Sequence, residues 1–463
     1  MGEPTERLQH PEGRSARIAL LLYGSPDHDS RVLKSAAALR DAGAEVLIIG
    51  RSIIHTGAVE GHSLIGADLP VYRTQDLDLT RTLPGLTRWW RRLRGKPAAT
   101  PTTAAPAPAT PAAPPAPPRP TNAPSPRPAG LRARLADLYM RGYDVARIVR
   151  YWAEAIQAAR RFRPDVVHAN DGNTLPPALV LRRLTRCRIV YDSHELWTRR
   201  NVLRYRWLAP HVEALIERTG ARRAHGVITV SDSIADWMQA HLRLPRRPVV
   251  VRNIPLRQGP LPTPAQGRLR ELAGLEDEQQ VIAYCGGLAP GRGLEESIDA
   301  LALLPEQMHL VLLGWGSATY VNSLRHHANE RQVSDRVHVL PPVPSTEVPS
   351  TLADADVAVV FVRPVCLSYR YALPNKLFES IHAGLPVVAG DLPDIAAVVR
   401  STGVGELFDV QDPAALAAAV RTVVRDPAGY REAARRAAQE LDWRHEADAL
   451  VQVHHGAVRG FPV

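Results

Sequence analysis

The chain has 463 residues, of which 45% are hydrophobic and 22% charged, so it is long enough for two or three domains and has the composition of a soluble globular protein. It contains no run of about 18 apolar residues and begins with a polar stretch unlike a signal peptide, which excludes a membrane-spanning protein and favours a cytoplasmic one. The net charge of +10 favours an anionic partner, namely nucleic acid, a membrane surface or a phosphorylated substrate.

The first predicted strands are the apolar, β-branched runs 16–24 and 44–51, which are separated by a helical pattern. A basic segment follows over 88–96, with Trp89 and Trp90 among its cations. This mixture is typical either of a solvated helix edge whose tryptophans pack inward or of a helix that lies on the inner face of an anionic membrane. The cations of the segment are Arg88, Arg91, Arg92, Arg94 and Lys96.

Proline, alanine and threonine dominate residues 97–128, a composition that cannot form a packed core. We expect a disordered Pro/Ala-rich insert there, within the N-terminal domain. The alternation of strand-like and helix-like segments then resumes, which is typical of a parallel sheet covered by helices on both faces. The further strands of this domain are predicted at 164–171, 187–195, 225–232 and 248–254.

The same alternation restarts after a proline-rich link, LRQGPLPTPAQG. Strands of a second sheet are predicted at 280–287, 308–316, 335–342, 355–363 and 385–391. We therefore expect an α/β protein with two Rossmann-like, doubly wound domains that face a cleft. The domains are predicted over 1–255 and 256–440, and a C-terminal helix and tail over 441–463 is expected to pack back toward the N-terminal domain.

A glycine-rich loop joins a strand to a helix in GGLAPGRGLEESIDAL, residues 286–301. Arg292 and Gly293 stand where a Walker A loop has its lysine and its serine or threonine, so a P-loop NTPase is disfavoured. Free backbone amides and a guanidinium near a helix N-terminus nevertheless suit a phosphate. The alternative is a flexible loop that binds nothing.

The stretch 373–388, LPNKLFESIHAGLPVV, predicts a helix that ends at Gly384 and leads into a buried strand. Lys376 lies in the first turn of this helix, where the helix dipole disfavours a cation by about 0.3 to 1 kcal/mol. An anion bound near the helix start would account for the lysine. The alternative is a surface salt bridge between Lys376 and Glu379, which is worth only a few tenths of a kcal/mol and does not explain the unfavourable position.

FESIHAGLPVV after LPNK, preceded by the glycine-rich loop and by LLGWG, resembles the donor-binding half of the retaining glycosyltransferases of family 4, which have the GT-B fold. PDVVHAND, VYDSHELW and HGVITVSDSIAD continue the resemblance in the first half of the chain. It implies that Glu379 accepts hydrogen bonds from the ribose hydroxyls of a sugar nucleotide. It also implies that Arg292 and Lys376 stabilise the diphosphate leaving group catalytically, in place of a metal. The donor-binding residues that it implies are Gly286, Gly287, Arg292, Gly314, Tyr371, Asn375, Lys376 and Glu379.

Two positions depart from the family pattern. Tyr371 stands eight residues before Glu379, where the family has a second glutamate, and Gly287 stands where many members carry an arginine. We therefore expect less positive charge around the diphosphate and a contact from Tyr371, rather than from a carboxylate, to the donor sugar.

On the N-terminal side, His194 follows a predicted strand and has Asp192 and Glu195 beside it. A histidine in such a place more often packs or caps than catalyses. Because the family has an active-site histidine after the equivalent strand, the resemblance implies that His194 contacts the reacting sugar or the acceptor. Asp171, in HANDGN, and Glu195 are further candidates on the acceptor side.

No metal site is expected. Asp354 and Asp356 have the D-x-D spacing of metal-dependent glycosyltransferases, but they precede a predicted strand and so fall at the end opposite the cleft, as a cap or turn. The adjacent histidines at 326–327 and 454–455 lie in helical patterns, where neighbouring side chains point about 100° apart and do not readily share one metal.

The sequence thus predicts a hexosyltransferase of carbohydrate biosynthesis that uses a nucleotide-sugar donor and an unidentified glycan, lipid-linked or small-molecule acceptor, with retention of configuration and without a metal or other cofactor. The alternatives are a sugar-nucleotide epimerase on the same fold and a non-catalytic, nucleotide-binding partner of another transferase. Nucleic-acid binding is disfavoured, because no helix-turn-helix, zinc-finger or RNA-binding aromatic motif accompanies the positive charge.

Overall fold

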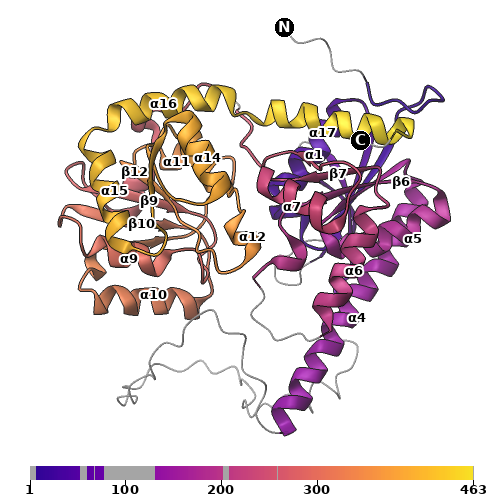
Figure 1. The fold of residues 1–463 in the computed structure, drawn as a ribbon, viewed down its shortest axis with the longest axis horizontal. Helices are drawn as coiled ribbons and strands as arrows, with labels where there is room; N and C mark the ends of the chain where they lie inside the picture. The colour runs from indigo at the N-terminus through magenta and orange to yellow at the C-terminus, as the bar shows by residue number, and fades with distance from the viewer. Residues whose placement is uncertain are drawn as a thin grey trace.

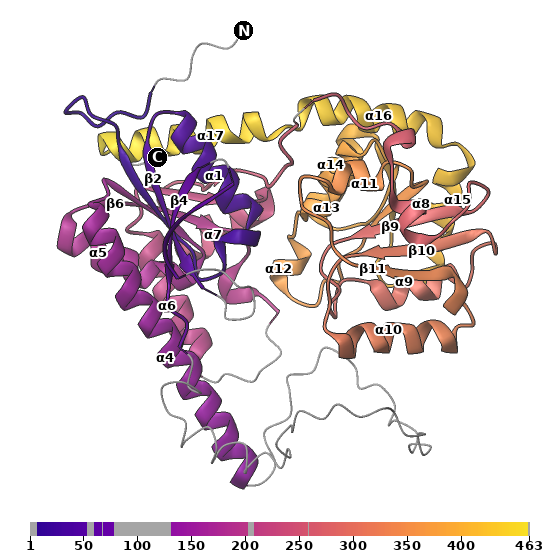
Figure 2. The ribbon, with the colours of Figure 1, turned by 180° about the vertical axis from the view of Figure 1, so that it is seen from behind.

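Two sheets, each flanked by helices, form the two lobes of the protein (Figures 1 and 2). The computed structural model describes residues 7–52, 60–66, 68–77, 131–201, 208–257 and 259–461. The basic segment 88–96 and the insert 97–128 lie outside the described residues, so the predictions made for them stay predictions.

The N-terminal sheet has the strand order β3-β4-β2-β1-β5-β6-β7-β8. All neighbouring strands are parallel except β3 and β4, which form an antiparallel pair at one edge. Its strands are β1 Arg17–Leu21, β2 Glu45–Arg51, β3 Gly61–Ile65, β4 Leu69–Thr74, β5 Val166–Asn170, β6 Arg188–Ser193, β7 Gly226–Thr229 and β8 Val249–Val250.

Helices cover both faces of this sheet. The helices α1 and α17 bury their apolar residues against one face, while α4 to α7 bury theirs against the other. Each face of a parallel strand therefore meets a helix, which explains why the strands read as continuous apolar runs. The helices are α1 Ser30–Asp41, α4 Leu131–Phe162, α5 Leu175–Thr185, α6 Ala209–Ala221, α7 Asp232–Leu242 and α17 Trp443–Arg459.

The C-terminal sheet has the order β11-β10-β9-β12-β13-β14, and all its neighbouring strands are parallel. Its strands are β9 Gln280–Cys285, β10 Met308–Leu313, β11 Val337–Leu340, β12 Val357–Val360, β13 Val387–Gly390 and β14 Gly405–Phe408. The helices around it are α8 Leu269–Ala273, α9 Leu294–Leu301, α10 Ala318–Glu330, α11 Val348–Leu352, α12 Leu367–Arg370, α13 Asn375–His382, α14 Pro393–Thr402, α15 Pro413–Arg425 and α16 Pro427–Glu440.

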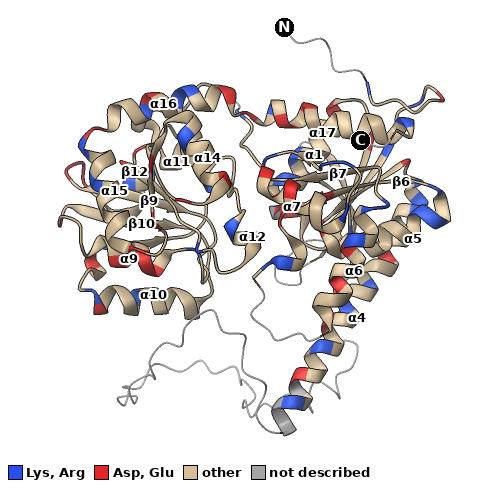
Figure 3. Ribbon diagram, viewed as in Figure 1, with Lys and Arg blue, Asp and Glu red and all other residues tan. Residues whose placement is uncertain are grey.

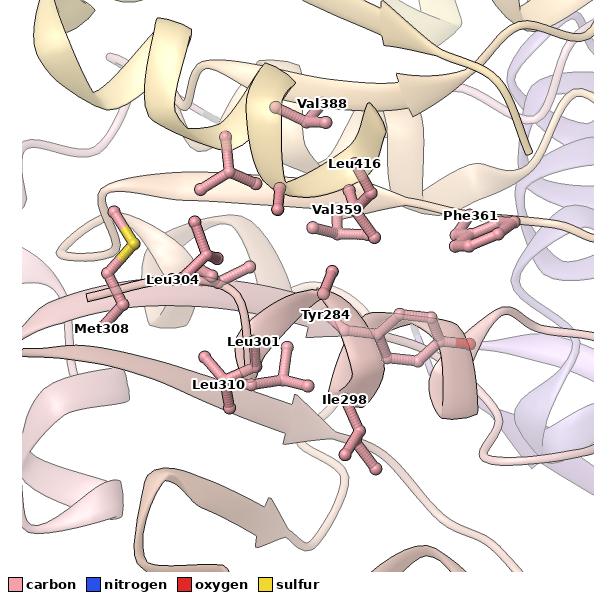
Figure 4. Packing of buried hydrophobic residues seen from close by; sticks show 14 of the residues in the cluster. Tyr284, Ile298, Leu301, Leu304, Met308, Leu310, Val359, Phe361, Val388 and Leu416 are labelled. Carbon is pink, nitrogen blue, oxygen red and sulfur yellow. The ribbon is translucent and has the colours of Figure 1, made fainter. Parts of the chain in front are cut away.

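The largest core cluster of the C-terminal lobe joins α9 to the sheet (Figure 4). Ile298 and Leu301 of α9 pack with Leu310 of β10, Val359 of β12 and Leu416 of α15. Each of these side chains is at most 3% exposed, and full burial of such a residue contributes roughly 1.5 to 3 kcal/mol. This packing fixes the start of α9, and with it the glycine-rich loop that precedes α9.

The helix α17 continues from α16 of the C-terminal lobe and lies on the N-terminal lobe (Figure 1). Trp443, Leu450, Val453 and Val458 of α17 are buried in the N-terminal core. The last helix therefore covers part of one face of a sheet whose first strand lies more than 400 residues earlier in the chain.

Basic and acidic residues are mixed along outer helices such as α4 and α16 (Figure 3). Within the described residues, no helix combines the length and apolar character that crossing a membrane requires.

The predicted fold class is confirmed, since each predicted strand overlaps an observed strand of one of two mostly parallel sheets. The strands β3, β4 and β14 were not predicted. The residues of β3 are exposed or half-buried in alternation, and Pro70 interrupts the apolar pattern of β4, so neither has the continuous apolar run of a central strand.

Candidate active site between the two lobes

A cavity of about 370 Å³ lies between the two lobes, at the carboxyl ends of β6 and β9. This is the place where open parallel sheets bind ligands. The N-terminal lobe contributes His194 and Glu195. The C-terminal lobe contributes residues of three segments, which include Gly286, Gly287, Arg292, Tyr369, Asn375, Lys376 and Glu379. Most of the residues that the sequence predicts for the site are thus brought together here.

The glycine-rich loop has a conformation that brings Arg292 to this cavity. Gly293, at the N-cap of α9, has φ +73°, and a Cβ atom there would lie 2.1 Å from the ring of Phe361, so only glycine fits. The guanidinium of Arg292 lies over the ring of Tyr369, 5.1 Å from its centroid. Arg292 forms no ion pair within the described part of the chain, so its charge is available to an anion in the cavity.

Lys376 is buried in the wall of the cavity rather than exposed at a helix start. It is 6% exposed, its Nζ donates to the Phe361 carbonyl at 2.8 Å, and the ammonium lies 4.1 Å from the centroid of the Tyr284 ring. Burial, together with the charge of Arg292, holds the pKa of Lys376 well below its usual value. A bound anion would offset both effects, so the free site has an unmet preference for negative charge.

Glu379 lies one turn further along α13 and also lines the cavity. It accepts a hydrogen bond from the Cys285 thiol, with a sulfur–oxygen distance of 3.4 Å, and burial raises the pKa of its carboxyl. Glu379 forms no ion pair with Lys376, whose ammonium contacts Phe361 and Tyr284 instead. The alternative of a surface salt bridge between the two is therefore wrong.

A second, larger cavity of about 930 Å³ continues from the first and shares Cys285, Gly286, Gly287, Asn375 and Glu379 with it. Its walls include Gly314 and the exposed Trp315 after β10. A Cβ atom on Gly314 would lie 1.9 Å from the Gly286 carbonyl oxygen, so the two loops meet backbone to backbone. The two adjoining cavities therefore lie along the carboxyl edge of the C-terminal sheet.

On the N-terminal side, carboxylates surround His194. Its backbone N–H donates to Asp171 Oδ1 at 3.0 Å, and its Nε2 lies 3.1 Å from Asn170 Oδ1 and 3.5 Å from Asp192 Oδ2. Asp171 has φ 58° and ψ 166°, a region almost confined to glycine, which costs about 1 to 3 kcal/mol. This strained turn places the Asp171 carboxylate, Oδ2 at 3.7 Å, beside Nδ1 of the histidine.

These contacts keep His194 protonated near neutral pH. Burial disfavours the imidazolium, but the carboxylates of Asp171 and Asp192 outweigh it and raise the pKa of His194 to about 9. Burial raises the pKa of Glu195, and the charge of Asp171 adds to the effect. His194 is therefore a hydrogen-bond donor at the mouth of the cavity.

The stability of the protein should depend on this histidine. Because the pKa of His194 is about 9 in the folded state and about 6.5 when unfolded, its contribution is fully present below pH 6.5 and lost as pH rises through 9. The shift corresponds to about 3 kcal/mol. We expect the difference in free energy of unfolding between the wild type and His194→Asn, from urea titrations, to shrink over this range. A difference that stays constant from pH 6 to pH 10 would contradict the assignment.

The sequence prediction missed the residue that holds Asp192. Arg31, in α1, donates from Nε and Nη2 to the two oxygens of Asp192 at 2.9 and 2.8 Å, and from Nη1 to the Val251 carbonyl at 2.7 Å. Arg31 is 2% exposed and Asp192 is fully buried. Burial opposes the ionised carboxyl, but Arg31 outweighs it and holds the pKa of Asp192 well below its usual value. The only signal in the sequence is a charged residue on the side of α1 that also carries apolar side chains.

Tyr371 lies elsewhere than predicted. Its ring packs against the apolar core of the N-terminal lobe, and its carbonyl accepts a hydrogen bond from the Ser231 hydroxyl at 2.9 Å. Tyr371 does not line the cavity, whereas Tyr369, two residues earlier, does. The physical reason is that Tyr369 lies within α12, whereas Tyr371 follows the end of this helix at Arg370. The two side chains therefore point in different directions.

The acidic D-x-D pair has a structural role, as predicted. Asp354 accepts from the backbone N–H groups of Leu269 and Arg270, at the start of α8, and Asp356 pairs with the Arg270 guanidinium at 2.7 Å. Among the adjacent histidines, His327 contacts Asp299 at 2.8 Å, whereas His454 is fully buried beneath the N-terminal sheet.

Comparison with known proteins accords with this geometry. A model of the glycosyl transferases group 1 matches residues 266–441, and a model of glycosyltransferase family 4 matches residues 99–253. The chain belongs to the family 4 glycosyltransferases of the GT-B fold. The family 4 model ends and the group 1 model begins between β8 and α8, so one model matches each lobe of this GT-B protein.

Two relatives in sequence are a D-inositol 3-phosphate glycosyltransferase of Xylanimonas cellulosilytica and a glycogen synthase of Mycobacterium tuberculosis. The first is 31% identical over 210 residues, which are 44% of this chain and 49% of the relative. The second is 28% identical over 319 residues, which are 65% of this chain and 71% of the relative. This GT-B chain therefore spans about half the length of the first relative.

Solved structures show the same fold. The sucrose-phosphate synthase of Thermosynechococcus elongatus superimposes with a TM-score of 0.65 at 18% identity, covering 94% of this chain and 98% of the other. Anabaena HepE in complex with UDP-glucose superimposes with a TM-score of 0.62 at 17% identity, with the same coverage. At these identities the likeness establishes the GT-B fold alone.

Proposed function

We propose that the protein transfers a sugar from a nucleoside diphosphate sugar to an acceptor, with retention of configuration and without a metal. The observation that carries this proposal is the cavity between the lobes, where Arg292 and Lys376, whose positive charge a bound anion would favour, lie opposite His194. A single pocket that holds cations on one side and a protonated histidine on the other suits a substrate with a diphosphate at one end and a reacting sugar at the other.

In this proposal, the diphosphate lies against Gly286, Gly287, Arg292 and Lys376, and Glu379 accepts hydrogen bonds from the ribose. The base extends into the larger cavity past Gly314. As the bond between the anomeric carbon and the diphosphate oxygen breaks, negative charge grows on the leaving group, so fixed cations stabilise the transition state more than the ground state. These cations make a divalent metal unnecessary.

His194 would donate a hydrogen bond to the reacting sugar or to the acceptor, with Asp171 and Glu195 beside it. A third cavity, of about 470 Å³, adjoins His194 on the N-terminal side and is lined by Ser25, Arg31 and Asn253 among others. We assign the acceptor to this space. The new bond forms on the same face of the sugar as the departing diphosphate, which is what retention requires.

A uridine nucleotide is the proposed donor, because Anabaena HepE has been solved with UDP and with UDP-glucose. Thermal unfolding in the presence of UDP, GDP, ADP and dTDP tests this choice. UDP at 100 times its dissociation constant should stabilise the fold by about 2.7 kcal/mol, and the others should stabilise it less. Equal shifts from all four nucleotides would remove the support for uridine.

Product analysis tests the reaction itself. With UDP-glucose and a set of sugar and polyol phosphates as acceptors, we expect release of UDP and an α-linked product by proton NMR, with undiminished rate in EDTA. Interconversion of UDP-sugars without net UDP release would instead identify an epimerase. Nucleotide binding without donor hydrolysis or transfer to any acceptor would favour a non-catalytic partner.

A further inference from the structure

The short helix α12 belongs to the C-terminal lobe but contacts both lobes. It lies on the side of its lobe that faces the N-terminal lobe (Figure 1). Leu367 and Tyr371, four residues apart, pack against the core cluster of the N-terminal lobe. Tyr369, between them, packs against the C-terminal core and lines the cavity of the active site. Because positions four apart share one side of a helical turn and the position between them points away, each side of α12 meets a different lobe.

Hydrogen bonds strengthen this junction on the N-terminal side. The Ser231 hydroxyl, at the N-cap of α7, donates to the Tyr371 carbonyl at 2.9 Å. The backbone N–H of Ser233 donates to Asp394 Oδ1, in α14, at 3.0 Å. The start of α7 is thus joined to the C-terminal lobe by two hydrogen bonds, and one of them ends on Tyr371.

The other side of α12 determines what Arg292 contacts. The guanidinium of Arg292 lies over the Tyr369 ring, 5.1 Å from its centroid, and the same ring lies beside Gly291, where a Cβ atom would approach it to 3.4 Å. Among the described residues, this guanidinium forms neither an ion pair nor a hydrogen bond. The Tyr369 ring is therefore the protein contact that orients the Arg292 cation.

A four-residue helix depends on its surroundings for its conformation. A single turn gains too few backbone hydrogen bonds to offset the entropy lost in ordering it, so packing must hold it in place. In α12, the backbone N–H groups of Arg370 and Tyr371 donate to the carbonyls of Cys366 and Leu367 at 3.0 and 3.1 Å. These bonds close one turn around Tyr369, so a displacement of Tyr371 displaces Tyr369 as well.

We propose that Tyr371 is a positioning residue for Arg292: anchored in the N-terminal lobe, it holds α12 so that the Tyr369 ring keeps the guanidinium at the cavity. The tyrosine that stands where the family has a glutamate thus has an anchoring role. Because separation of the lobes removes the anchor, the placement of Arg292 depends on contact between the lobes. The action of Arg292 on a diphosphate rests on the proposed function, whereas its link to Tyr371 does not.

The test observes Arg292 directly and does not require activity. In protein that contains carbon-13 arginine, the Cδ–Hδ NMR signal of Arg292 is assigned by its loss in Arg292→Lys, and Tyr369→Leu should remove the ring-current shift that the tyrosine causes. Tyr371→Ala should remove most of this shift, whereas Tyr371→Phe keeps the anchoring ring and should retain it. In a chain that already carries Tyr369→Leu, Tyr371→Ala should have no further effect on the signal.

A matched control separates positioning from a general loss of packing. Tyr72→Ala removes another half-buried tyrosine from the same core cluster, but from β4, so it should lower the melting temperature and leave the Arg292 signal unchanged. Leu367→Ala weakens the second anchor and should reduce the shift even if Tyr371→Ala fails to fold. In turnover assays, Tyr371→Ala should lower kcat by about tenfold, leave UDP affinity nearly unchanged, and cause no added loss in an Arg292→Ala chain.

The outcomes distinguish this link from the proposed function. An Arg292 signal at its wild-type position in both Tyr371→Ala and Leu367→Ala, or an equal displacement in Tyr72→Ala, would overturn the link. A displaced signal in a chain that transfers no sugar would support the link and refute only the proposed function. A displaced signal with wild-type turnover would also support the link, and would remove Arg292 from the proposed site.

Discussion

Replacing Arg31 by methionine is expected to lower the free energy of unfolding by about 3 to 5 kcal/mol. Methionine keeps most of the apolar stem but leaves the Asp192 carboxylate buried without its two strongest donors and leaves the Val251 carbonyl without the guanidinium. A buried charge that loses its partner costs far more than an exposed one. Urea titration at pH 7 measures the change.

The exposed pair of Arg400 and Asp391 provides the control. Their side chains are 63% and 50% exposed, so Arg400→Met should change the free energy of unfolding by no more than about 1 kcal/mol. Adding Asp192→Asn to Arg31→Met should recover part of the lost stability, because the carboxylate charge is then gone. An Arg31→Met protein as stable as the wild type would show that the ion pair is not formed as described.

Arg292→Ala is expected to lower turnover by about a hundredfold, which corresponds to about 3 kcal/mol in the barrier. Arg292 has no carboxylate partner within the described residues, so its loss should leave the melting temperature nearly unchanged. Because the charge of the leaving diphosphate grows as the bond breaks, the rate should fall more than UDP affinity. Rate, affinity and melting temperature measured on one preparation check all three statements.

Glu379→Ala, unlike Arg292→Ala, should lower UDP affinity more than turnover. A hydrogen bond to ribose is made in both the ground state and the transition state, so UDP affinity should fall while kcat changes little. Arg421→Ala is a suitable control, because its guanidinium donates to the Leu303 carbonyl and, among the described residues, neither forms an ion pair nor lines one of the cavities of the site. Wild-type turnover in Arg292→Ala would remove this residue from the proposed site.

The sequence predicts the central strands well because their apolar runs are continuous, and strand ends then point to the site. Gly286 and His194 each follow a strand directly, and Arg292 lies in the loop after the first of these strands, so local pattern alone brings them to the carboxyl edge. The function of Lys376 was inferred from its unfavourable place in a helix, and the structure puts it in the cavity wall. Its bond to the Phe361 carbonyl was not predictable, since that contact depends on how α13 packs against β12.

Long-range polar contacts are what the sequence does not reveal. Arg31 and Asp192 are 161 residues apart, and nothing near Arg31 distinguishes it from an arginine on a solvated helix face. His454 likewise reads as half of an adjacent histidine pair, although its ring is stacked on a histidine 286 residues earlier. The contact predicted for Tyr371 was wrong for a related reason. Its spacing from Glu379 in the sequence does not indicate how the four-residue helix α12 directs the chain between them.

The packing of α17 on the N-terminal sheet also has a consequence for synthesis of the protein. A nascent chain emerges from the ribosome with its first sheet long before residues 443–459 exist, so the face of that sheet that α1 and α17 share has only α1 until those residues have been made. During that interval, Val166, Val190 and Ile228 have no partner from α17. The N-terminal lobe, although made first, should therefore reach its native state only after the whole C-terminal lobe has been made.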